Sequence, residues 1–240
     1  AAYPLVVVRT PWDYFTRLPE FLAWAERTSK LTAFVNPYPV IEWNSHKAYL
    51  RELAAKGIPT VPTLWLDRGA GDGAARLRET GWADVVVKPA VSIGAVGALR
   101  AEASDPACVA HLEALLAEGD AMVQPFVDSI ASEGEVSLVY FGGAFSHAIR
   151  KRPAVGDYRV QDIYGGTVQA CTPAADELAL AAAALVVTPV PTTYARVDLV
   201  RLSDGRPAVM ELELIEPELF LGATPEAAPR FAEVLRNYVG

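Results

Sequence analysis

Apolar and polar residues alternate along this chain in patterns that predict both strands and helices. Short apolar or β-branched runs predict strands over residues 5–8, 31–35, 61–66, 85–88, 121–126, 135–141, 144–150, 194–202 and 207–214. Helical spacing of apolar residues predicts helices over residues 19–27, 45–56, 76–81, 106–117, 176–185 and 225–238.

Turn residues join two pairs of these strands into hairpins. A Gly-Gly pair at 142–143 separates one pair, and a Ser-Asp-Gly turn at 203–205 separates another. Hairpins build antiparallel sheets, so their mixture with helices predicts an α+β fold with mostly antiparallel sheets. The proline-rich residues 36–39 predict a loop. We expect a domain boundary near residues 42–60 and a hinge near 124–128.

The composition narrows the class of protein and of partner. The chain has 240 residues, 52% of them hydrophobic, and its net charge is −8. Its length is sufficient for a substantial hydrophobic core. Its acidic net charge argues against a basic surface that would bind nucleic acid. No apolar run reaches the roughly 18 residues of a membrane span. Two cysteines without metal-like spacing indicate a reduced, cytoplasmic setting.

Three acidic residues mark the last predicted hairpin. Glu211 and Glu213 are two apart on one strand and so share a face, and the turn brings Asp198 opposite them. Uncompensated carboxylates repel one another, and a hard divalent cation such as Mg²⁺ relieves that repulsion. The alternative is a surface hairpin with its acidic face in water. In both cases the packed face would hold Val197, Leu199, Met210 and Leu212.

Several basic residues stand where a phosphate could bind. Lys88 ends an apolar strand and precedes a loop of small residues at 92–97, whose backbone N–H groups could add to its charge. Lys47 lies near a predicted helix start, and Lys151 belongs to the basic cluster 150–152. The alternative for each is an ordinary solvated side chain.

Two further segments suggest a nucleotide and a reacting group. The strand end at 123–127 could hold an adenine ring, with Glu135 accepting from the ribose hydroxyls. Arg159 and Arg196 could stabilise negative charge that develops during a reaction. Read singly, each segment is equally compatible with a plain strand or a surface arginine.

Taken in order, these motifs resemble the ATP-grasp superfamily, especially its glutathione-synthetase-like and D-alanine–D-alanine-ligase-like branches. The resemblance runs from about residue 36 to 222. It rests on Asn44-Ser-His-Lys47, Val85-Val-Val-Lys-Pro89, Gln124-Pro-Phe-Val127, Gly134-Glu135-Val-Ser137, Arg196-Val-Asp198 and Glu211-Leu-Glu213. The family usually has Asn as its last metal ligand, so Glu213 departs from the pattern and adds negative charge.

The resemblance implies an ATP-grasp fold of two lobes that grip ATP between their sheets. We expect a partial N-terminal α/β segment on the substrate side at 1–45, a small lobe at 46–125 and a large lobe at 126–240. Family members have further N-terminal α/β residues before the first strand seen here.

The resemblance also implies roles for individual residues. ATP would be held by Lys47, Lys88, Ser92, Gly94, Gln124, Phe126, Val127 and Glu135. One or two Mg²⁺ ions would be held by Asp198, Glu211 and Glu213. Charge on the reacting groups would be stabilised by Arg159, Arg196 and Lys151. We expect substrate contacts from Arg9, Asp13 and Glu216.

A narrower group shares further motifs. Arg9-Thr-Pro-Trp-Asp-Tyr14, Trp43-Asn44, Ser146-His-Ala-Ile-Arg-Lys151 and Glu211-Leu-Glu-Leu-Ile-Glu-Pro217 resemble the group that includes the ligase closing the ring of D-cycloserine from O-ureido-D-serine. This resemblance implies a cytoplasmic ligase of antibiotic biosynthesis with a small, amino-acid-like substrate. It would activate a carboxylate as an acyl phosphate for attack by an amine or an internal nucleophile.

Two alternatives stay open from the sequence. The same ATP site could serve an ATP-grasp kinase or phosphotransferase, which would release a stable phosphorylated product. The chain could also be a non-catalytic nucleotide-binding module. In the resembling family, dimers and tetramers are common, so a homo-oligomer is expected, with no nucleic-acid or membrane partner.

Overall fold

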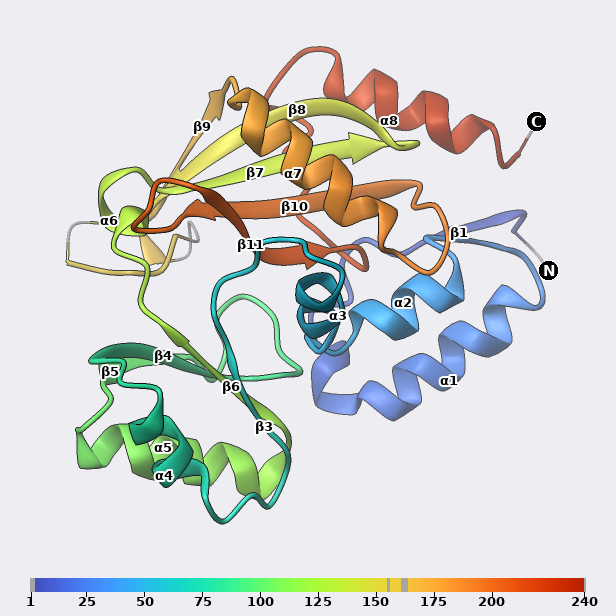
Figure 1. Cartoon of the computed structure of the whole chain (residues 1–240). Coiled ribbons are helices and arrows are strands. Elements are labelled where there is room, and N and C mark those ends of the chain that lie inside the picture. Colours follow the sequence, from blue (N-terminus) through green and yellow to red (C-terminus); the bar gives the residue numbers. More distant parts are fainter. Residues whose placement is uncertain (1–2, 155, 161–163, 240) are drawn as a thin grey trace.

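A computed structural model describes residues 3–154, 156–160 and 164–239 of the chain. The described residues form a five-stranded sheet, a four-stranded sheet and a two-stranded N-terminal sheet, with helices packed around them. Figure 1 shows the larger sheet above the smaller one, with the N-terminal helices beside both. This arrangement confirms the α+β fold with mostly antiparallel sheets.

The larger sheet has the strand order β11-β10-β7-β8-β9, and all its neighbouring strands are antiparallel. Its strands are β7 (Glu135–Phe141), β8 (Ala144–Arg152), β9 (Thr167–Cys171), β10 (Tyr194–Arg201) and β11 (Pro207–Glu213). Both predicted hairpins are confirmed, as β7–β8 and β10–β11. Strand β9 was not predicted because it lies at the sheet edge and is mostly exposed, without an apolar run.

The two faces of the larger sheet differ in polarity. On one face, Leu138, Val197 and Leu212 pack against α7 (Ala175–Val186) and α3 (Tyr49–Ala55). Successive side chains along a strand point to opposite faces. The other face therefore receives Ser137 and Asp198, which are buried and joined by a hydrogen bond. The packed face expected from the sequence is confirmed in the main.

A β-bulge explains the one residue that departs from this pattern. Asp198 pairs with Glu211, whereas Leu199 pairs with Val209, so Met210 has no partner in the ladder. The extra residue resets the alternation. Val209 consequently joins the main core, and Met210 packs against a different cluster that includes Val61.

The smaller sheet has the strand order β3-β6-β4-β5 and is also antiparallel. Its strands are β3 (Leu64–Leu66), β4 (Asp84–Pro89), β5 (Leu99–Glu102) and β6 (Ala121–Pro125). Helices α4 (Gly73–Glu79) and α5 (Pro106–Glu118) pack on it, and Leu77, Leu112 and Val85 share one buried cluster. The short helix α6 (Ser129–Ser132) follows the crossing into the larger sheet.

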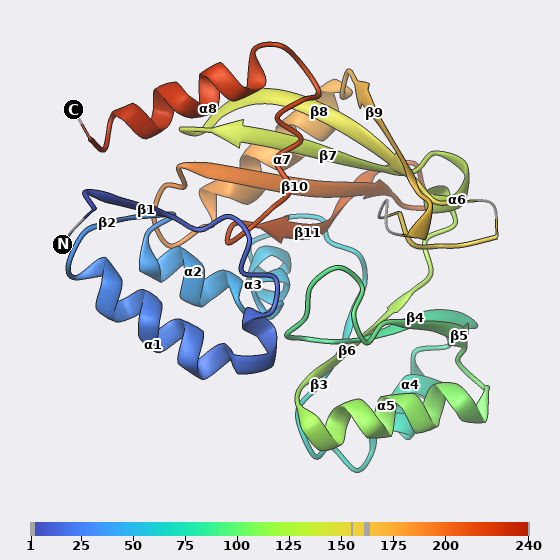
Figure 2. The same cartoon turned by 180° about the vertical axis from the view of Figure 1, so that it is seen from behind.

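The N-terminal part forms a small α/β unit beside the larger sheet. Strand β1 (Leu5–Val7) pairs in parallel with β2 (Ala33–Val35), connected through a 3₁₀ turn (Tyr14–Arg17) and helix α1 (Leu18–Ser29). Figure 2 shows this unit next to β10 and helix α8 (Ala227–Arg236). Val35 and Tyr194 share a cluster with Phe231 of α8.

The sequence prediction for residues 36–56 was wrong in part. The predicted loop contains the start of helix α2 (Tyr38–Asn44), and the predicted helix 45–56 is shortened to α3. Pro37 is the N-cap of α2 and Pro39 lies in its first turn, where proline's missing N–H is harmless. These prolines therefore begin a helix instead of breaking one.

Packing also bears on the expected lobes at 1–45, 46–125 and 126–240. Tyr49, Leu50 and Leu53 of α3 belong to the core of the larger sheet, not to that of the smaller one. This favours a small lobe that begins after α3, and the boundaries themselves stay a prediction. Among the described residues, no helix is both long and apolar enough to cross a membrane.

Asn36 ties the N-terminal unit to the larger sheet. Its side chain is fully buried and donates to the carbonyls of Tyr194 and Leu214, both at 2.8 Å. Its Oδ1 accepts from the backbone N–H groups of Thr193 at 2.6 Å and Tyr194 at 3.3 Å. One side chain thus satisfies four buried backbone groups.

We expect Asn36→Ala to lower the free energy of unfolding by about 3 kcal/mol or more, because each buried backbone group left unsatisfied costs roughly 1–3 kcal/mol. Urea unfolding of the ligand-free chain measures this. Asn237→Ala, at an exposed position in the last turn of the chain, should change it by less than about 0.5 kcal/mol. Equal effects of the two changes would contradict the assigned role of Asn36.

Candidate active site

A cavity of about 720 Å³ opens where the three parts of the molecule meet. The larger sheet contributes the polar ends of β7, β8, β10 and β11, the smaller lobe contributes the loop after β4, and the N-terminal unit contributes residues 12–16. Its charged lining consists of Asp13, Lys47, Glu135, Lys151, Arg196, Asp198, Glu211, Glu213, Glu216 and Glu218. A cavity of this size and polarity suits a charged small molecule.

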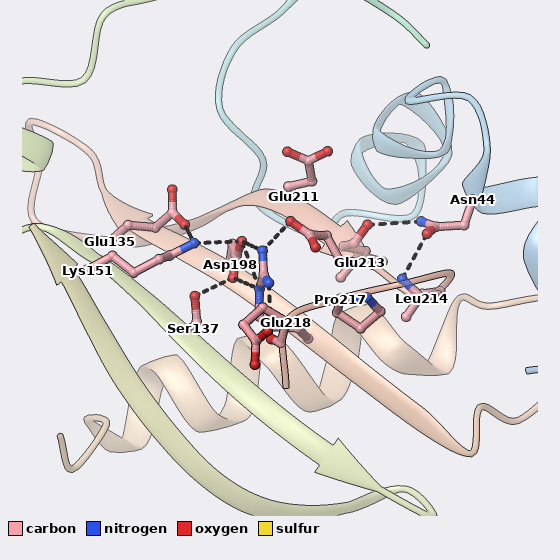
Figure 3. A network of polar contacts seen from close by, with 12 residues as sticks. Asn44, Glu135, Ser137, Lys151, Asp198, Glu211, Glu213, Leu214, Pro217 and Glu218 are labelled. Carbon is pink, nitrogen blue, oxygen red and sulfur yellow. Dashed lines mark hydrogen bonds and ion pairs between the residues drawn. The ribbon is translucent and has the colours of Figure 1, made fainter. Parts of the chain in front are cut away.

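Asp198 is the centre of a buried ionic network (Figure 3). Its carboxylate accepts from Lys151 Nζ at 3.0 Å, from Arg196 Nη2 at 2.9 Å and from the Ser137 hydroxyl. Lys151 also pairs with Glu135. Two basic residues therefore compensate the charge of Asp198, which would otherwise be costly to bury.

The two glutamates of β11 contact different bases. Glu213 pairs with Arg196, which lies opposite it in the β10–β11 ladder. Glu211 pairs with Lys47 at 3.2 Å. Lys47 also donates to the Ser92 carbonyl at 2.6 Å, so it connects the hairpin to the loop after β4. Each of the three acidic residues thus faces a cation.

Burial and mutual repulsion perturb the titration of this cluster. Burial raises the pKa of Glu213 to about 7, with Arg196 opposing the rise and Asp198 and Glu211 adding to it. Burial likewise raises the pKa of Glu135 to about 7 against the charge of Lys151. Burial also opposes ionisation of Asp198, but Arg196 and Lys151 outweigh it and lower its pKa. The acidic residues of this cluster outnumber its basic residues, so part of their negative charge is not neutralised.

The predicted metal ligands meet part of what a Mg²⁺ site requires. Asp198 lies directly across from Glu211, and Glu213 follows on the same face, so the three carboxylates line one cavity. In the described residues, however, no three His, Cys, Asp or Glu side chains lie close enough together to hold a metal ion. Glu211 is instead paired with Lys47, and Asp198 and Glu213 are paired with Arg196. The oxygen donors and the unrelieved negative charge fit a hard cation, and the assignment of these ligands stays a proposal.

The structure brings some predicted phosphate-binding residues to the cavity and not others. Lys47, Ser92 and Gly94 line it. Gly94 has φ +57°, a backbone conformation that glycine adopts without strain. Lys88 is half-buried and does not line the cavity, and it makes no ion pair with the described residues. Its pKa is lowered by burial, with Glu211 opposing.

The residues predicted to hold adenine lie outside the cavity. Gln124 is buried and donates to the Thr63 hydroxyl at 3.0 Å, and Val127 belongs to an apolar cluster. The Arg100 guanidinium lies 3.4 Å from the centre of the Phe126 ring. Glu135, expected at the ribose, does line the cavity but pairs with Lys151. The adenine-binding roles of Gln124, Phe126 and Val127 therefore stay a prediction.

Of the remaining residues predicted to act at the site, some line the cavity and others do not. Asp13 and Glu216 line the cavity, as do Lys151 and Arg196. Arg9 does not: it donates to the Pro217 carbonyl at 2.9 Å and lies over the Tyr194 and Phe231 rings, so it supports the chain behind the site.

Arg159 also lies outside the cavity lining. It pairs with Asp157 at 2.8 Å and stacks on the Tyr164 ring, 3.7 Å from its centre. The middle of its predicted motif, residues 161–163, lies outside the described residues. Arg159 therefore keeps its suggested catalytic role only as a proposal.

Some residues at the site had no role in the sequence analysis. Tyr14 and Phe220 line the cavity and add aromatic surface, and Ser137, beside the lining, donates a hydrogen bond to Asp198. Tyr14 and Ser137 lie within motifs quoted for the resemblance, but neither residue type points to chemistry by itself. Phe220 lies after the last metal motif, in a segment without regular periodicity.

Comparisons with known proteins agree with this geometry. Residues 1–36 match the family described as "D-cycloserine synthetase DcsG, N-terminal domain", and residues 75–187 match "Prokaryotic glutathione synthetase, ATP-grasp domain". The chain is 38% identical over 255 residues to the cycloserine biosynthesis protein DcsG of Streptomyces lavendulae, with coverage of 97% of this chain and 82% of that protein.

Solved structures match this chain at two levels of sequence identity, one above and two below 25%. A crystal structure of D-cycloserine synthetase DcsG matches with a TM-score of 0.89 and 35% identity, over 99% of this chain and 84% of that one. The D-alanine–D-alanine ligase of Bacillus anthracis matches with a TM-score of 0.67 and 19% identity, over 86% and 70%. The ATP-grasp ligase PsnB, complexed with a minimal precursor, Mg and ADP, gives 0.66 and 16%, over 99% and 78%. These last two show the fold alone.

The fold is that of the ATP-grasp superfamily, and the chain is an ATP-dependent ligase. Within that superfamily, it belongs to the D-cycloserine synthetase family.

The titration of the site makes stability depend on pH. Glu135 and Glu213 have pKa values raised to about 7, and Glu216 to about 8. The folded state therefore binds more protons than the unfolded state above the ordinary glutamate range, and stability falls as pH rises through these values. We expect the ligand-free chain to lose on the order of 2 kcal/mol of unfolding free energy between pH 6.5 and 8.5.

Urea unfolding at constant ionic strength across this range measures the loss. Below this range, the lowered pKa of His147 makes the unfolding free energy rise with pH, and at alkaline pH the lowered pKa of Lys88 does the same. The chosen range avoids both regions. An unfolding free energy that is constant or rises with pH would show that these carboxyl groups are not buried as described.

Proposed function

We propose that this ligase closes the ring of a small amino-acid derivative, converting an O-ureido-D-serine-like substrate into D-cycloserine at the expense of ATP. The support for this substrate is the family membership, together with a cavity in which three bases and seven acidic residues surround space for a small zwitterion. The cavity, about 720 Å³, lies in the size range of small-molecule sites.

Mg²⁺ and ATP are the expected cofactor and co-substrate. Asp198, Glu211 and Glu213 would hold the cation, which neutralises phosphate charge and orients the γ-phosphoryl group. Lys47, which already contacts Ser92, would hold phosphate together with the backbone of the loop that contains Gly94. Lys88 would join this set when the small lobe moves against the nucleotide. The adenine roles of Gln124, Phe126 and Val127 depend on the same movement.

The substrate carboxylate would attack the γ-phosphorus of ATP and form an acyl phosphate, with ADP as the leaving group. Lys151 and Arg196 are buried, charged and directed into the cavity. They are placed to stabilise the charge on the transferred group and on the acyl oxygen when the nucleophile adds. Arg159 would add to this charge if its segment moves toward the cavity.

The ureido nitrogen that is bonded to oxygen would then attack the acyl carbon, lose its proton and release phosphate, which closes the ring. Hydrolysis of the carbamoyl group on that nitrogen would release carbon dioxide and ammonia and leave D-cycloserine. Enclosure matters at the ring-closing step, because water would hydrolyse the acyl phosphate. The loop 92–96 and the segment 12–16 both line the cavity and cover it from two sides. We expect a cytoplasmic enzyme, with a homo-oligomer in keeping with its superfamily.

An ADP-release assay tests this function. O-ureido-D-serine with Mg-ATP and no second amine should give ADP and phosphate in equal amounts, with D-cycloserine as the product and with carbon dioxide and ammonia from the carbamoyl group. The L-enantiomer and D-serine measure selectivity. A stable phosphorylated product would instead identify a kinase, and dependence on an added amine would identify an intermolecular ligase.

We expect Glu211→Gln to reduce kcat for ADP release by at least about 100-fold, on the scale of removing one group that organises transition-state charge. The substitution conserves shape, and the Glu211 side chain is partly exposed, so folding should persist. Asp204→Asn, in the exposed turn of the same hairpin, is the matched control and should retain the parent rate. Full activity in Glu211→Gln would remove Glu211 from the metal site.

A further inference from the structure

One buried carboxylate of the cavity has no partner among the described residues. Glu216 is 9% exposed and lines the cavity. The other acidic residues of the network each contact a base, but no hydrogen bond or ion pair of Glu216 is found within residues 3–154, 156–160 and 164–239. A buried carboxylate without a partner is expensive, so its retention calls for a ligand.

Within the part of the chain that the structure describes, the cations near Glu216 are already held by other groups. Lys47 and Arg196 are the cations that influence it most, and both are held by other groups: Lys47 by Glu211 and Ser92, Arg196 by Asp198 and Glu213. The charge of Glu216 affects the pKa of Arg9, but the Arg9 guanidinium donates its hydrogen bond to the Pro217 carbonyl. Burial, reinforced by Glu213, raises the pKa of Glu216 to about 8.

A second unpartnered polar group belongs to the same part of the cavity. Tyr14 is 8% exposed, lines the cavity, and its hydroxyl makes no hydrogen bond with the described residues. Burial raises the pKa of this hydroxyl, and Glu216 is the charge that contributes most to the rise. Tyr14 also packs in one buried cluster with Ile215, the residue before Glu216. Tyr14 and Glu216 therefore lie near each other and reach the cavity from different elements, the 3₁₀ turn after β1 and the segment after β11.

Glu216 and Tyr14 make one part of the cavity suited to a cation, whereas the basic residues suit anionic groups. Lys47, Lys151 and Arg196 can receive anionic groups, whereas the Glu216 carboxylate and the Tyr14 hydroxyl oxygen can accept from the N–H donors of a cation. Trp12 and Phe15, which also line the cavity, add aromatic surface of the kind that favours a cation. An α-amino acid has both kinds of group attached to one carbon.

We propose that Glu216 and Tyr14 form the subsite for the α-ammonium group of the amino-acid substrate, and that this subsite turns the substrate carboxylate toward the basic residues. The inference rests on the proposed function, which supplies the amino-acid substrate, and goes beyond it by naming the residues that recognise its amine. Glu218 is not part of the subsite, because it is exposed and accepts from the Phe220 backbone N–H at 2.8 Å.

The test compares two compounds on two enzymes. O-ureido-D-serine carries the α-ammonium group, and 3-(ureidooxy)propanoic acid is the same molecule without it. Glu216→Gln should lower kcat/KM for O-ureido-D-serine by about 10–100-fold, the loss of a hydrogen bond to a charged group. The inhibition constant of the propanoic acid, measured against O-ureido-D-serine, should change less than threefold. Tyr14→Phe should give the same selectivity with a smaller loss.

Controls separate this subsite from a general defect. Glu233→Gln, on the exposed side of α8, should leave both constants unchanged, and the KM for ATP should be the same in all variants. Equal losses for the two compounds in Glu216→Gln, or no loss for either, would overturn the subsite. If the parent enzyme releases no ADP with O-ureido-D-serine, the proposed function fails and not the subsite. Calorimetric binding of D-serine and of 3-hydroxypropanoic acid to the same variants then tests Glu216 directly.

Discussion

The site depends on how acidic residues of the β10–β11 hairpin are neutralised. Asp198, Glu211 and Glu213 share one face of the larger sheet, and in the ligand-free chain they contact Lys151, Arg196 and Lys47. Removing any of these bases would leave a partly or fully buried charge uncompensated. The network therefore constrains both the stability of the sheet and the position of every charged group that a nucleotide would meet.

The same contacts explain how the site could change on binding. A bound cation and a triphosphate offer the carboxylates and the bases new partners of opposite charge, so ion pairs within the protein can be exchanged for contacts to ligands with little net loss of compensation. Lys47 is central to such an exchange, because it contacts Glu211 on the larger sheet and Ser92 in the loop of the smaller lobe. Glu216 differs from these residues, because it is paired with no base among the residues that the structure describes.

Sequence patterns anticipated the fold and much of the site, and the exceptions have physical causes. Asp198 and Glu211 were expected opposite each other because hairpin pairing follows from the turn at 203–205, and the register bears this out. The bulge at Met210, the exposed strand β9 and the helix started by Pro37 depend on tertiary contacts that local periodicity does not encode. The position of Arg9 behind the site, and of Gln124 and Phe126 outside the cavity, depends on how the lobes meet. The unpartnered state of Glu216 is likewise a property of packing.

A crystal structure of the chain with Mg²⁺ and a non-hydrolysable ATP analogue tests the account most directly. It should show carboxylate oxygens of Asp198 and Glu211 at about 2.1 Å from a Mg²⁺ ion that also binds phosphate oxygens, with Lys47 moved from Glu211 to a phosphate. A nucleotide bound elsewhere, or bound in the cavity while the Lys47–Glu211 and Arg196–Glu213 ion pairs stay intact and no metal contacts the hairpin, would contradict it.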